Sequence, residues 1–248
     1  MLRDKVAVVT GSSRGIGAAI AKRLARNGAR VVVNYAASKD RGQQVVADIA
    51  IAGGTAMLAR ADVTVPSEVE AMMRAAEAEL GPIDILVNNA NMSFPVAPFS
   101  EYRWEDFERK LTSELKASFF TCQAVVPGMM KRRSGVIVNV SSGLSRVPGP
   151  GFIAHSSAKS ALDAFSKSLA LELGPHGIRV NVVAPGLTLT DATSRQPQQA
   201  HEAARARTPL RRLGEPDDIA GAVLFCCSDQ ASFVTGVYLP VCGGSQMT

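Results

Sequence analysis

Hydrophobic residues form short, nearly continuous apolar runs that alternate with longer segments in which apolar positions recur every three or four residues. The short runs are rich in Val and Ile, and they lack the polar alternation of a sheet with one face in solvent. They predict strands over 5–10, 30–35, 55–60, 83–90, 135–142, 178–185 and 237–241. The longer segments predict helices over 15–27, 39–52, 66–80, 104–131, 152–174 and 216–228.

This regular alternation indicates βαβ units joined by right-handed crossovers. We therefore expect an α/β fold, in which a single doubly wound (Rossmann) parallel sheet of about seven strands carries helices on both faces. No linker, repeat or low-complexity tract interrupts the chain, so residues 1–248 are expected to form one domain. Residues 186–215 form one long irregular stretch, and loops of this length usually have a function. We predict that this stretch is a lid over a ligand site.

Composition narrows the function classes. With 46% hydrophobic and 20% charged residues, the chain has the material for one core. The net charge of +5 is spread out, and the basic runs at 131–133 and 205–212 lack interleaved aromatic residues, so we expect no nucleic-acid partner. We interpret those runs as solvated helix ends and a loop; the alternative is a surface for an anionic partner, such as a phosphorylated substrate, a coenzyme A ester or an acidic carrier protein.

Cysteine usage and hydropathy point to a cytoplasmic protein. The four cysteines show no metal-ligand spacing, so we expect buried free thiols and no metal site. No apolar run approaches the roughly 20 residues that span a bilayer, so we expect no membrane partner. The first residues lead directly into a strand and lack the apolar core of a signal peptide.

A glycine-rich segment, VVTGSSRGIGAAIA, follows the first strand and opens the first helix. Gly11 permits a tight turn, Gly15 lets the backbone approach a phosphate, and Gly17 lets the helix pack on the strand. The N–H groups at the start of the helix then point at the pyrophosphate of the ligand. This strand–loop–helix context predicts a dinucleotide-binding site.

The end of the second strand favours NADP(H). Dehydrogenases that prefer NAD place an acidic residue there to bind the ribose 2′-hydroxyl. This chain instead has Asn34, Tyr35 and Ser38, with the cations Arg14, Lys39 and Arg41 nearby. Because a carboxylate is missing and cations are close, we expect the 2′-phosphate of NADP to be bound.

Further motifs resemble a known family. They are T-G-x-x-x-G-I-G at 10–17, Asp62-Val63, N-N-A at 88–90, Ser142, Lys159, P-G at 185–186 and the segment 208–225. Together they resemble the short-chain dehydrogenase/reductases over essentially the whole chain, most closely the 3-oxoacyl-(acyl-carrier-protein) reductase type. The resemblance implies a nicotinamide cofactor and a small-molecule carbonyl substrate, which coenzyme A or acyl carrier protein can carry.

The resemblance also implies roles for individual residues. Asp62 and Val63 would hold the adenine, Asn89 and Ala90 would pass beside the ribose, and Lys159 would bond the nicotinamide ribose. Further cofactor contacts are implied for Ser13, Ile16, Pro185, Gly186 and Thr188. The helices near 104–131 and 152–174 would pair in a homotetramer, or in a hetero-oligomer with a homologue.

Three positions depart from the family pattern. The family usually has a Tyr four residues before the Lys and a Ser thirteen residues before that Tyr; here these positions are His155 and Ser142. Asn91 replaces the glycine of N-N-A-G, and we expect only a slight adjustment because Asn tolerates positive φ. Glu114 stands where the family usually has an Asn that holds a proton-relay water, which would place a carboxylate near Lys159 and His155.

Histidine is an imperfect substitute for that tyrosine. Its ordinary pKa suits proton transfer, but the ring reaches roughly 2 Å less far than a phenol oxygen. The Lys159 cation would also favour neutral imidazole, a poorer acid, unless Glu114 offsets it. We therefore expect an NADPH-dependent reductase of a ketone or 3-oxoacyl thioester with weak or altered activity, and with catalytic residues Ser142, His155, Lys159 and Glu114.

Two alternatives stay open. One is a catalytically impaired NADP-binding subunit that assembles with an active homologue. The other is a non-redox enzyme, because Ser142, His155 and Glu114 have the residue types of a hydroxyl–imidazole–carboxylate triad.

Overall fold

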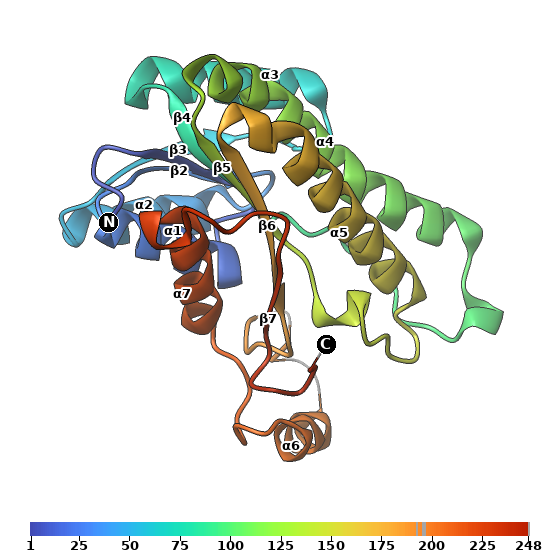
Figure 1. Ribbon diagram of the computed structural model, residues 1–248. Helices are drawn as coiled ribbons and strands as arrows, with labels where there is room; N and C mark the ends of the chain where they lie inside the picture. The colour runs from blue at the N-terminus through green and yellow to red at the C-terminus, as the bar shows by residue number, and fades with distance from the viewer. Residues whose placement is uncertain (192, 195–196, 248) are drawn as a thin grey trace.

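The structure, a computed structural model, describes residues 1–191, 193–194 and 197–247 (Figure 1). Its strands are β1 (Val6–Val9), β2 (Arg30–Tyr35), β3 (Thr55–Arg60), β4 (Ile83–Asn88), β5 (Gly135–Val140), β6 (Ile178–Pro185) and β7 (Tyr238–Val241). Its α-helices are α1 (Gly15–Arg26), α2 (Lys39–Ile51), α3 (Pro66–Leu80), α4 (Trp104–Arg132), α5 (Ile153–Leu173), α6 (Gln198–Arg207) and α7 (Pro216–Cys227). Every strand and helix that the hydrophobic pattern predicted is present.

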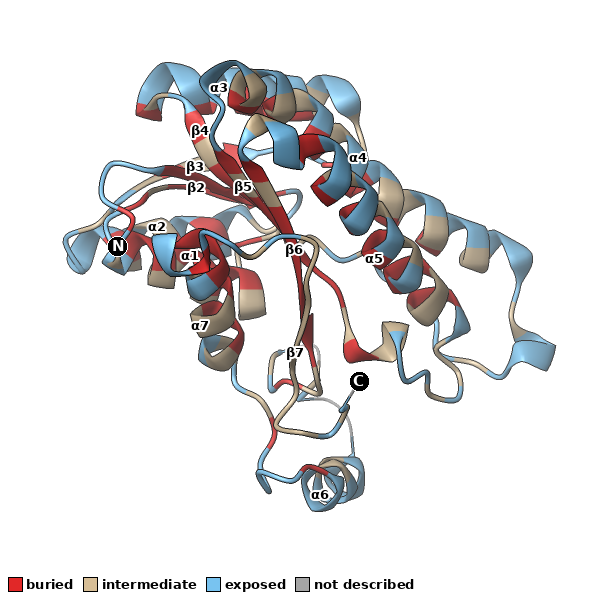
Figure 2. Cartoon of the chain, viewed as in Figure 1, coloured by how far each residue is buried: buried red, intermediate tan, exposed pale blue. Residues whose placement is uncertain are grey.

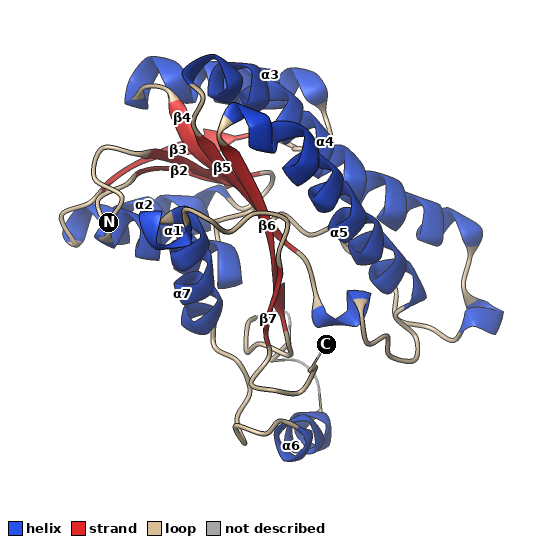
Figure 3. Cartoon of the chain, in the orientation of Figure 1, coloured by secondary structure: helices blue, strands red, loops and turns tan. Residues whose placement is uncertain are grey.

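The seven strands form one sheet in the order β3-β2-β1-β4-β5-β6-β7, and all neighbouring strands are parallel (Figure 3). The chain first builds outward from β1 to β3 and then returns to place β4 on the other side of β1. This reversal leaves a crevice at the carboxyl ends of β1 and β4, which is where open α/β sheets bind ligands. The predicted doubly wound sheet is confirmed.

Alternate residues of each strand enter two hydrophobic cores, one on each face of the sheet. On β1, Ala7 and Val9 pack toward α1, α2 and α7, whereas Val6 and Val8 pack toward α3, α4 and α5. Figure 2 shows buried residues along the strands and on the inward sides of these helices. Burial on both faces explains why the strand sequences are almost continuously apolar.

The segment 186–215 is not irregular throughout, which corrects the sequence prediction. It contains α6, a ten-residue helix none of whose residues is buried. The two ends of the segment are joined, because Leu189 N donates to Gly214 O (2.8 Å) and Gly214 N donates to Leu187 O (3.0 Å). An exposed helix needs no apolar stripe, so hydrophobic periodicity could not find it. The part of the predicted lid at residues 192, 195 and 196 lies outside the described residues.

The structure shows the state of the four cysteines, and its described residues show whether metal-ligand clusters and membrane-spanning helices are present. Cys122, Cys226 and Cys227 are buried, Cys242 is half-buried, and all four are free thiols. Within the described ranges, no three His, Cys, Asp or Glu side chains are grouped as a metal site requires. No helix in the same part of the chain is long and apolar enough to cross a membrane.

The turn after α5 provides a test of its backbone conformation and of its close approach to the end of α4. Gly177 has a φ of +72°, and a Cβ on it would lie 2.4 Å from the carbonyl oxygen of Arg133. Gly174 is helical, and a Cβ there would meet nothing within 4 Å. We expect Gly177→Ala to lower the free energy of unfolding by about 1–3 kcal/mol, and Gly174→Ala to leave it equal or raise it by up to about 1 kcal/mol. Urea unfolding of both variants checks this, and equal effects would contradict the assigned backbone geometry.

Candidate active site

A cleft of about 520 Å³ runs across the carboxyl ends of β1, β4, β5 and β6. The predicted cofactor residues in its wall are Gly11, Ser13, Arg14, Gly15, Ile16, Gly17, Asn34, Tyr35, Ser38, Asp62, Val63, Asn89, Ala90, Pro185 and Gly186. Ser142, His155 and Lys159 line the same cleft. Residues from seven separate stretches of sequence therefore meet at the edge where the strand order reverses.

The glycine loop is fixed by side-chain amides and a threonine hydroxyl. Asn89 Nδ2 donates to Thr10 O (2.9 Å) and Gly11 O (3.1 Å), while Thr10 Oγ1 accepts from Asn89 N (2.9 Å) and Ala90 N (3.0 Å). A Cβ on Gly17 would lie 2.6 Å from Gly11 O, so only glycine lets α1 approach the loop this closely. The loop is thus shaped before any ligand binds.

Asn34 supports this loop from the end of β2. Its Oδ1 accepts from Gly11 N (2.9 Å), its Nδ2 donates to Ala61 O (3.1 Å), and only 2% of the residue is exposed. The amide is therefore occupied by backbone groups, although Asn34 also lines the cleft, and its contact with a cofactor stays a prediction. Buried Ser12 braces the same turn, because Ser12 Oγ donates to Val9 O (2.7 Å) and accepts from Asn34 N (3.0 Å). Ser12 was not singled out in the sequence.

Thr188 does not line the cleft, so the structure does not bring it together with the other predicted cofactor residues. It is buried, and its hydroxyl donates to Gly186 O (3.1 Å). Thr190 and Asp191 line the cleft instead. The sequence Leu-Thr-Leu-Thr at 187–190 offers two threonines, and only the course of the backbone decides which one faces inward.

The end of the cleft next to β2 carries both cationic and acidic groups. Arg14 and Ser38 line it beside Tyr35. Arg41 at the start of α2 pairs with Asp191 of the segment 186–215, with 2.5 Å between Nη1 and Oδ2. This exposed ion pair connects the two sides of the cleft.

At the other end, Ser142 and the first turns of α5 form the wall. Ser142 precedes a 3₁₀ turn, and its Oγ accepts from Leu144 N (3.2 Å). His155 and Lys159 follow one helical turn apart on α5, and both are buried. The shared face predicted from their spacing is confirmed.

A polar ladder beneath this wall connects α4, β4, β5 and α5. Asn88 Nδ2 donates to Asn139 Oδ1 (2.9 Å), and Asn139 Nδ2 donates to Ser166 Oγ (2.7 Å). Thr121 Oγ1 donates to Asn88 Oδ1 (2.7 Å). These buried, satisfied groups fix how α4 and α5 lie across the sheet.

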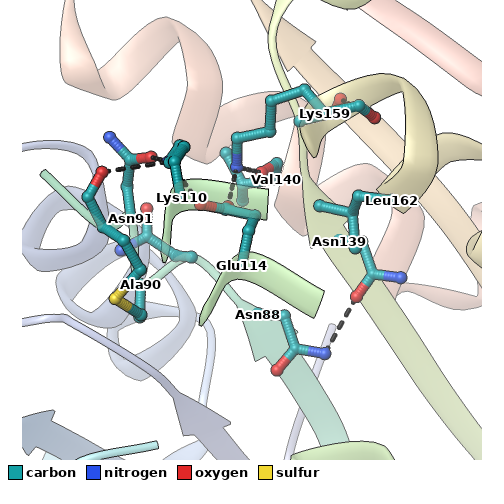
Figure 4. A network of polar contacts seen from close by, with 12 residues as sticks. Asn88, Ala90, Asn91, Lys110, Glu114, Asn139, Val140, Lys159 and Leu162 are labelled. Atoms are coloured by element: carbon teal, nitrogen blue, oxygen red, sulfur yellow. Dashed lines mark hydrogen bonds and ion pairs between the residues drawn. The ribbon is translucent and has the colours of Figure 1, made fainter. Parts of the chain in front are cut away.

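Glu114 lies between Lys110 and Lys159 in a network of polar contacts (Figure 4). It does not line the cleft. Lys159 Nζ donates to Glu114 Oε1 (2.5 Å) and to Val140 O (2.8 Å). The other carboxylate oxygen accepts from Lys110 Nζ (2.5 Å). Burial alone would raise the pKa of Glu114, but Lys159 and Lys110 outweigh it and lower the pKa to about 2. The predicted proximity to Lys159 is confirmed, and the catalytic role expected for Glu114 stays a prediction.

His155 is a neutral imidazole throughout the physiological range. Burial, and then the Lys159 and Lys110 cations, lower its pKa to about 3. The ring stacks on Phe94 with centroids 4.7 Å apart, and its Nδ1 is buried without a hydrogen-bond partner among the described residues. Because both oxygens of Glu114 bind lysines, the proposed Ser142–His155–Glu114 triad does not form.

Lys110 is a site residue that sequence reasoning missed. It is fully buried, and its Nζ donates to Asn91 Oδ1 (2.6 Å) and Met92 O (3.0 Å) as well as to Glu114. Asn91 does not adopt a positive φ, so its side chain rather than its backbone conformation is what this position uses. The one available signal was the spacing of Lys110 and Glu114, which suits an i,i+4 ion pair.

A glycine loop at the crevice of a doubly wound sheet is typical of dinucleotide-binding proteins, and comparison with known proteins shows which class this chain belongs to. Residues 11–246 match the family model described as enoyl-(acyl carrier protein) reductase. The chain belongs to the short-chain dehydrogenase/reductase family, and it is an oxidoreductase of the type that acts on CH–OH groups.

Within this family, the chain is similar to 3-oxoacyl-(acyl-carrier-protein) reductases. It is 40% identical to that enzyme of Vibrio cholerae over 249 residues, covering 99% of each chain. It is 42% identical to an uncharacterized oxidoreductase of Methylorubrum extorquens over 246 residues, covering 98% of each chain. A solved 7α-hydroxysteroid dehydrogenase complexed with NADH and 7-oxo glycochenodeoxycholic acid is 39% identical with a TM-score of 0.94, over 99% of this chain and 96% of that one.

The buried imidazole predicts an acid-sensitive fold. His155 takes up a proton near pH 6.5 when unfolded but only near pH 3 when folded, so acidification between these values favours the unfolded chain. We expect the free energy of unfolding, measured with urea, to be about 2 kcal/mol lower at about pH 5 than at about pH 7 because of this group. In His155→Phe, which keeps the stack on Phe94, that part of the loss should disappear. Equal losses in both proteins would show that His155 is not held neutral.

Proposed function

We propose that this protein is an NADPH-dependent reductase of a ketone or 3-oxoacyl thioester. The observation that carries the proposal is one continuous cleft, which begins at the glycine loop and ends at Ser142, His155 and Lys159. The relatives named as 3-oxoacyl-(acyl-carrier-protein) reductases, and a neighbour solved with NADH and a ketone, support the same reaction type.

The residues present fit a nicotinamide dinucleotide. The start of α1 points free N–H groups at the cleft, as pyrophosphate binding requires, and Gly17 keeps the loop close to the helix. Arg14 and Ser38 line the cleft and would bind a 2′-phosphate, and the end of β2 has no carboxylate to oppose one. When bound, the reduced cofactor supplies a hydride.

Ser142 and His155 would polarise the substrate carbonyl. Ser142 Oγ and an imidazole N–H are both donors, and both residues line one wall of the cleft. Lys159 Nζ uses two of its three N–H donors on Glu114 and Val140 O, which leaves one for a ribose hydroxyl. The chain thus supplies orientation and hydrogen bonds.

The site lacks an efficient proton donor for the substrate oxygen among its described residues. An imidazole whose pKa is about 3 stays neutral at pH 7, and a neutral imidazole is a poor acid. The same observation favours a second candidate, a cofactor-binding subunit with little turnover of its own. Dinucleotide binding without turnover on a panel of ketones would select this second function.

Cofactor preference can be tested at Arg14. We expect Arg14→Ala to weaken NADPH binding about tenfold and to leave NADH binding within about twofold, because one charge-assisted contact to the 2′-phosphate is lost. Fluorescence titration of both nucleotides measures the effect. Arg74→Ala is the matched control, since Arg74 on α3 is exposed and does not line the cleft. Equal loss for NADH and NADPH would argue against a 2′-phosphate at Arg14.

The proton-transfer argument can be tested at His155. Exchange for tyrosine, the residue usual in the family, should raise NADPH oxidation dependent on an acetoacetyl thioester by about tenfold or more, since a positioned general acid contributes at least that much. Ser142→Ala in the same background should abolish the gain. An unchanged or lower rate in His155→Tyr would overturn the assigned role of position 155.

A further inference from the structure

Lys110 is buried inside the protein although it carries a positive charge. It lies on α4, one turn before Glu114, and none of its surface is exposed. Its Nζ has three oxygen partners and lies 5.1 Å from the centre of the Phe94 ring. Burying a lysine is costly, so this arrangement needs a reason beyond helix packing.

The buried cluster is not neutral. Glu114 gives one carboxylate oxygen to Lys110 and the other to Lys159, as Figure 4 shows. Two ammonium groups therefore share a single carboxylate, which leaves one excess positive charge.

This excess charge lies directly behind the catalytic end of the cleft. Lys159 and His155 line the wall, and so do Asn91 and Met92, whose polar atoms bind Lys110. Lys110 and Glu114 do not line it. Fixed charges in such a water-poor setting act strongly on charge that develops in the cleft.

We infer that Lys110 is a positioning residue that holds one excess positive charge behind the His155–Lys159 wall, where it stabilises the oxyanion formed from a ketone substrate. The inference rests on the proposed function. As a hydride adds to the carbonyl carbon, the carbonyl π pair moves to oxygen, and that oxygen then takes a proton from water and leaves hydroxide. Stabilisation of the oxyanion thereby takes over part of the task that neutral His155 performs poorly.

The charge of Lys110 can be removed by raising the pH, which gives a way to test the inference. Burial and the Lys159 cation lower its pKa, Glu114 raises it, and the result is a pKa of about 8. The titratable groups that face it are Glu114 on α4 and Lys159 and His155 on α5; Asn91 and the Met92 carbonyl face it from the loop after β4. Above about pH 8 the cluster loses its excess charge, whereas His155 and Glu114 do not titrate in this range.

The ratio of the dissociation constants of NADP⁺ and NADPH depends on this charge, and it can be measured without any turnover. A positive charge near the nicotinamide disfavours the oxidised ring, and the phosphates, common to both forms, cancel in the ratio of the two dissociation constants. We expect Kd(NADP⁺)/Kd(NADPH) of the wild type to fall about fivefold between about pH 7 and pH 9.5. Lys110→Met should already show the lower ratio at about pH 7.

Two further variants make the result specific. Lys116→Met, an exposed lysine on the same helix, should follow the wild type at both pH values. Lys110→Arg keeps a charge that does not titrate below pH 10, so its ratio should stay at the higher value. It also serves if Lys110→Met unfolds, which thermal unfolding will reveal.

The outcomes separate the two proposals. A ratio that depends on pH in the wild type and in Lys116→Met, but not in either Lys110 variant, supports the inference. A ratio at about pH 7 that is the same in Lys110→Met as in the wild type, or the same pH dependence in all four proteins, overturns it while leaving the proposed function intact. Failure of the wild type to bind either nucleotide overturns the proposed function itself.

Discussion

The parallel direction of all seven strands is the constraint on which this molecule depends. Because every strand ends at the same edge of the sheet, each connection that follows a strand contributes side chains to one surface. The glycine loop after β1, Asn89 after β4, Ser142 after β5 and Pro185 at the end of β6 meet there, although nearly the whole chain separates them. The order reversal between β1 and β4 then opens the crevice, and helices on both faces keep the sheet rigid beneath it.

Most of this fold could be predicted from the sequence, since burial on both faces leaves a strong pattern. The expected bounds of β2, β3, α3 and β6 agree with the structure residue for residue. Helix α6 was missed for the complementary reason, because a helix that buries nothing has no apolar periodicity to detect. Hydrophobic periodicity therefore detects the elements that pack against the core, and it does not detect elements outside the core.

The candidate site was predictable where a residue acts through local chemistry. Gly11 and Gly17 could be predicted from the geometry that the glycine loop requires. His155 and Lys159 could be predicted from their spacing on one helix face. Lys110 escaped notice because a lysine ordinarily indicates a solvated surface, and only tertiary packing from the loop after β4 buries it. The hydrogen bonds between the Asn34 amide and backbone groups could not be predicted, because an asparagine at a strand end suits either a ligand or the backbone.

The burial of the thiols has a practical consequence for spectroscopy. Burial raises the pKa of Cys122 to about 12 and that of Cys226 to about 11, and it raises the pKa of Cys227 as well. Since the thiolate is the species that reacts with maleimides, these three positions resist labelling at neutral pH. Half-buried Cys242 is left as the one attachment point, and a Cβ on Gly186 would lie only 2.9 Å from its Cβ, at the rim of the cleft. A fluorophore can therefore be placed beside the nucleotide crevice of the unmodified sequence.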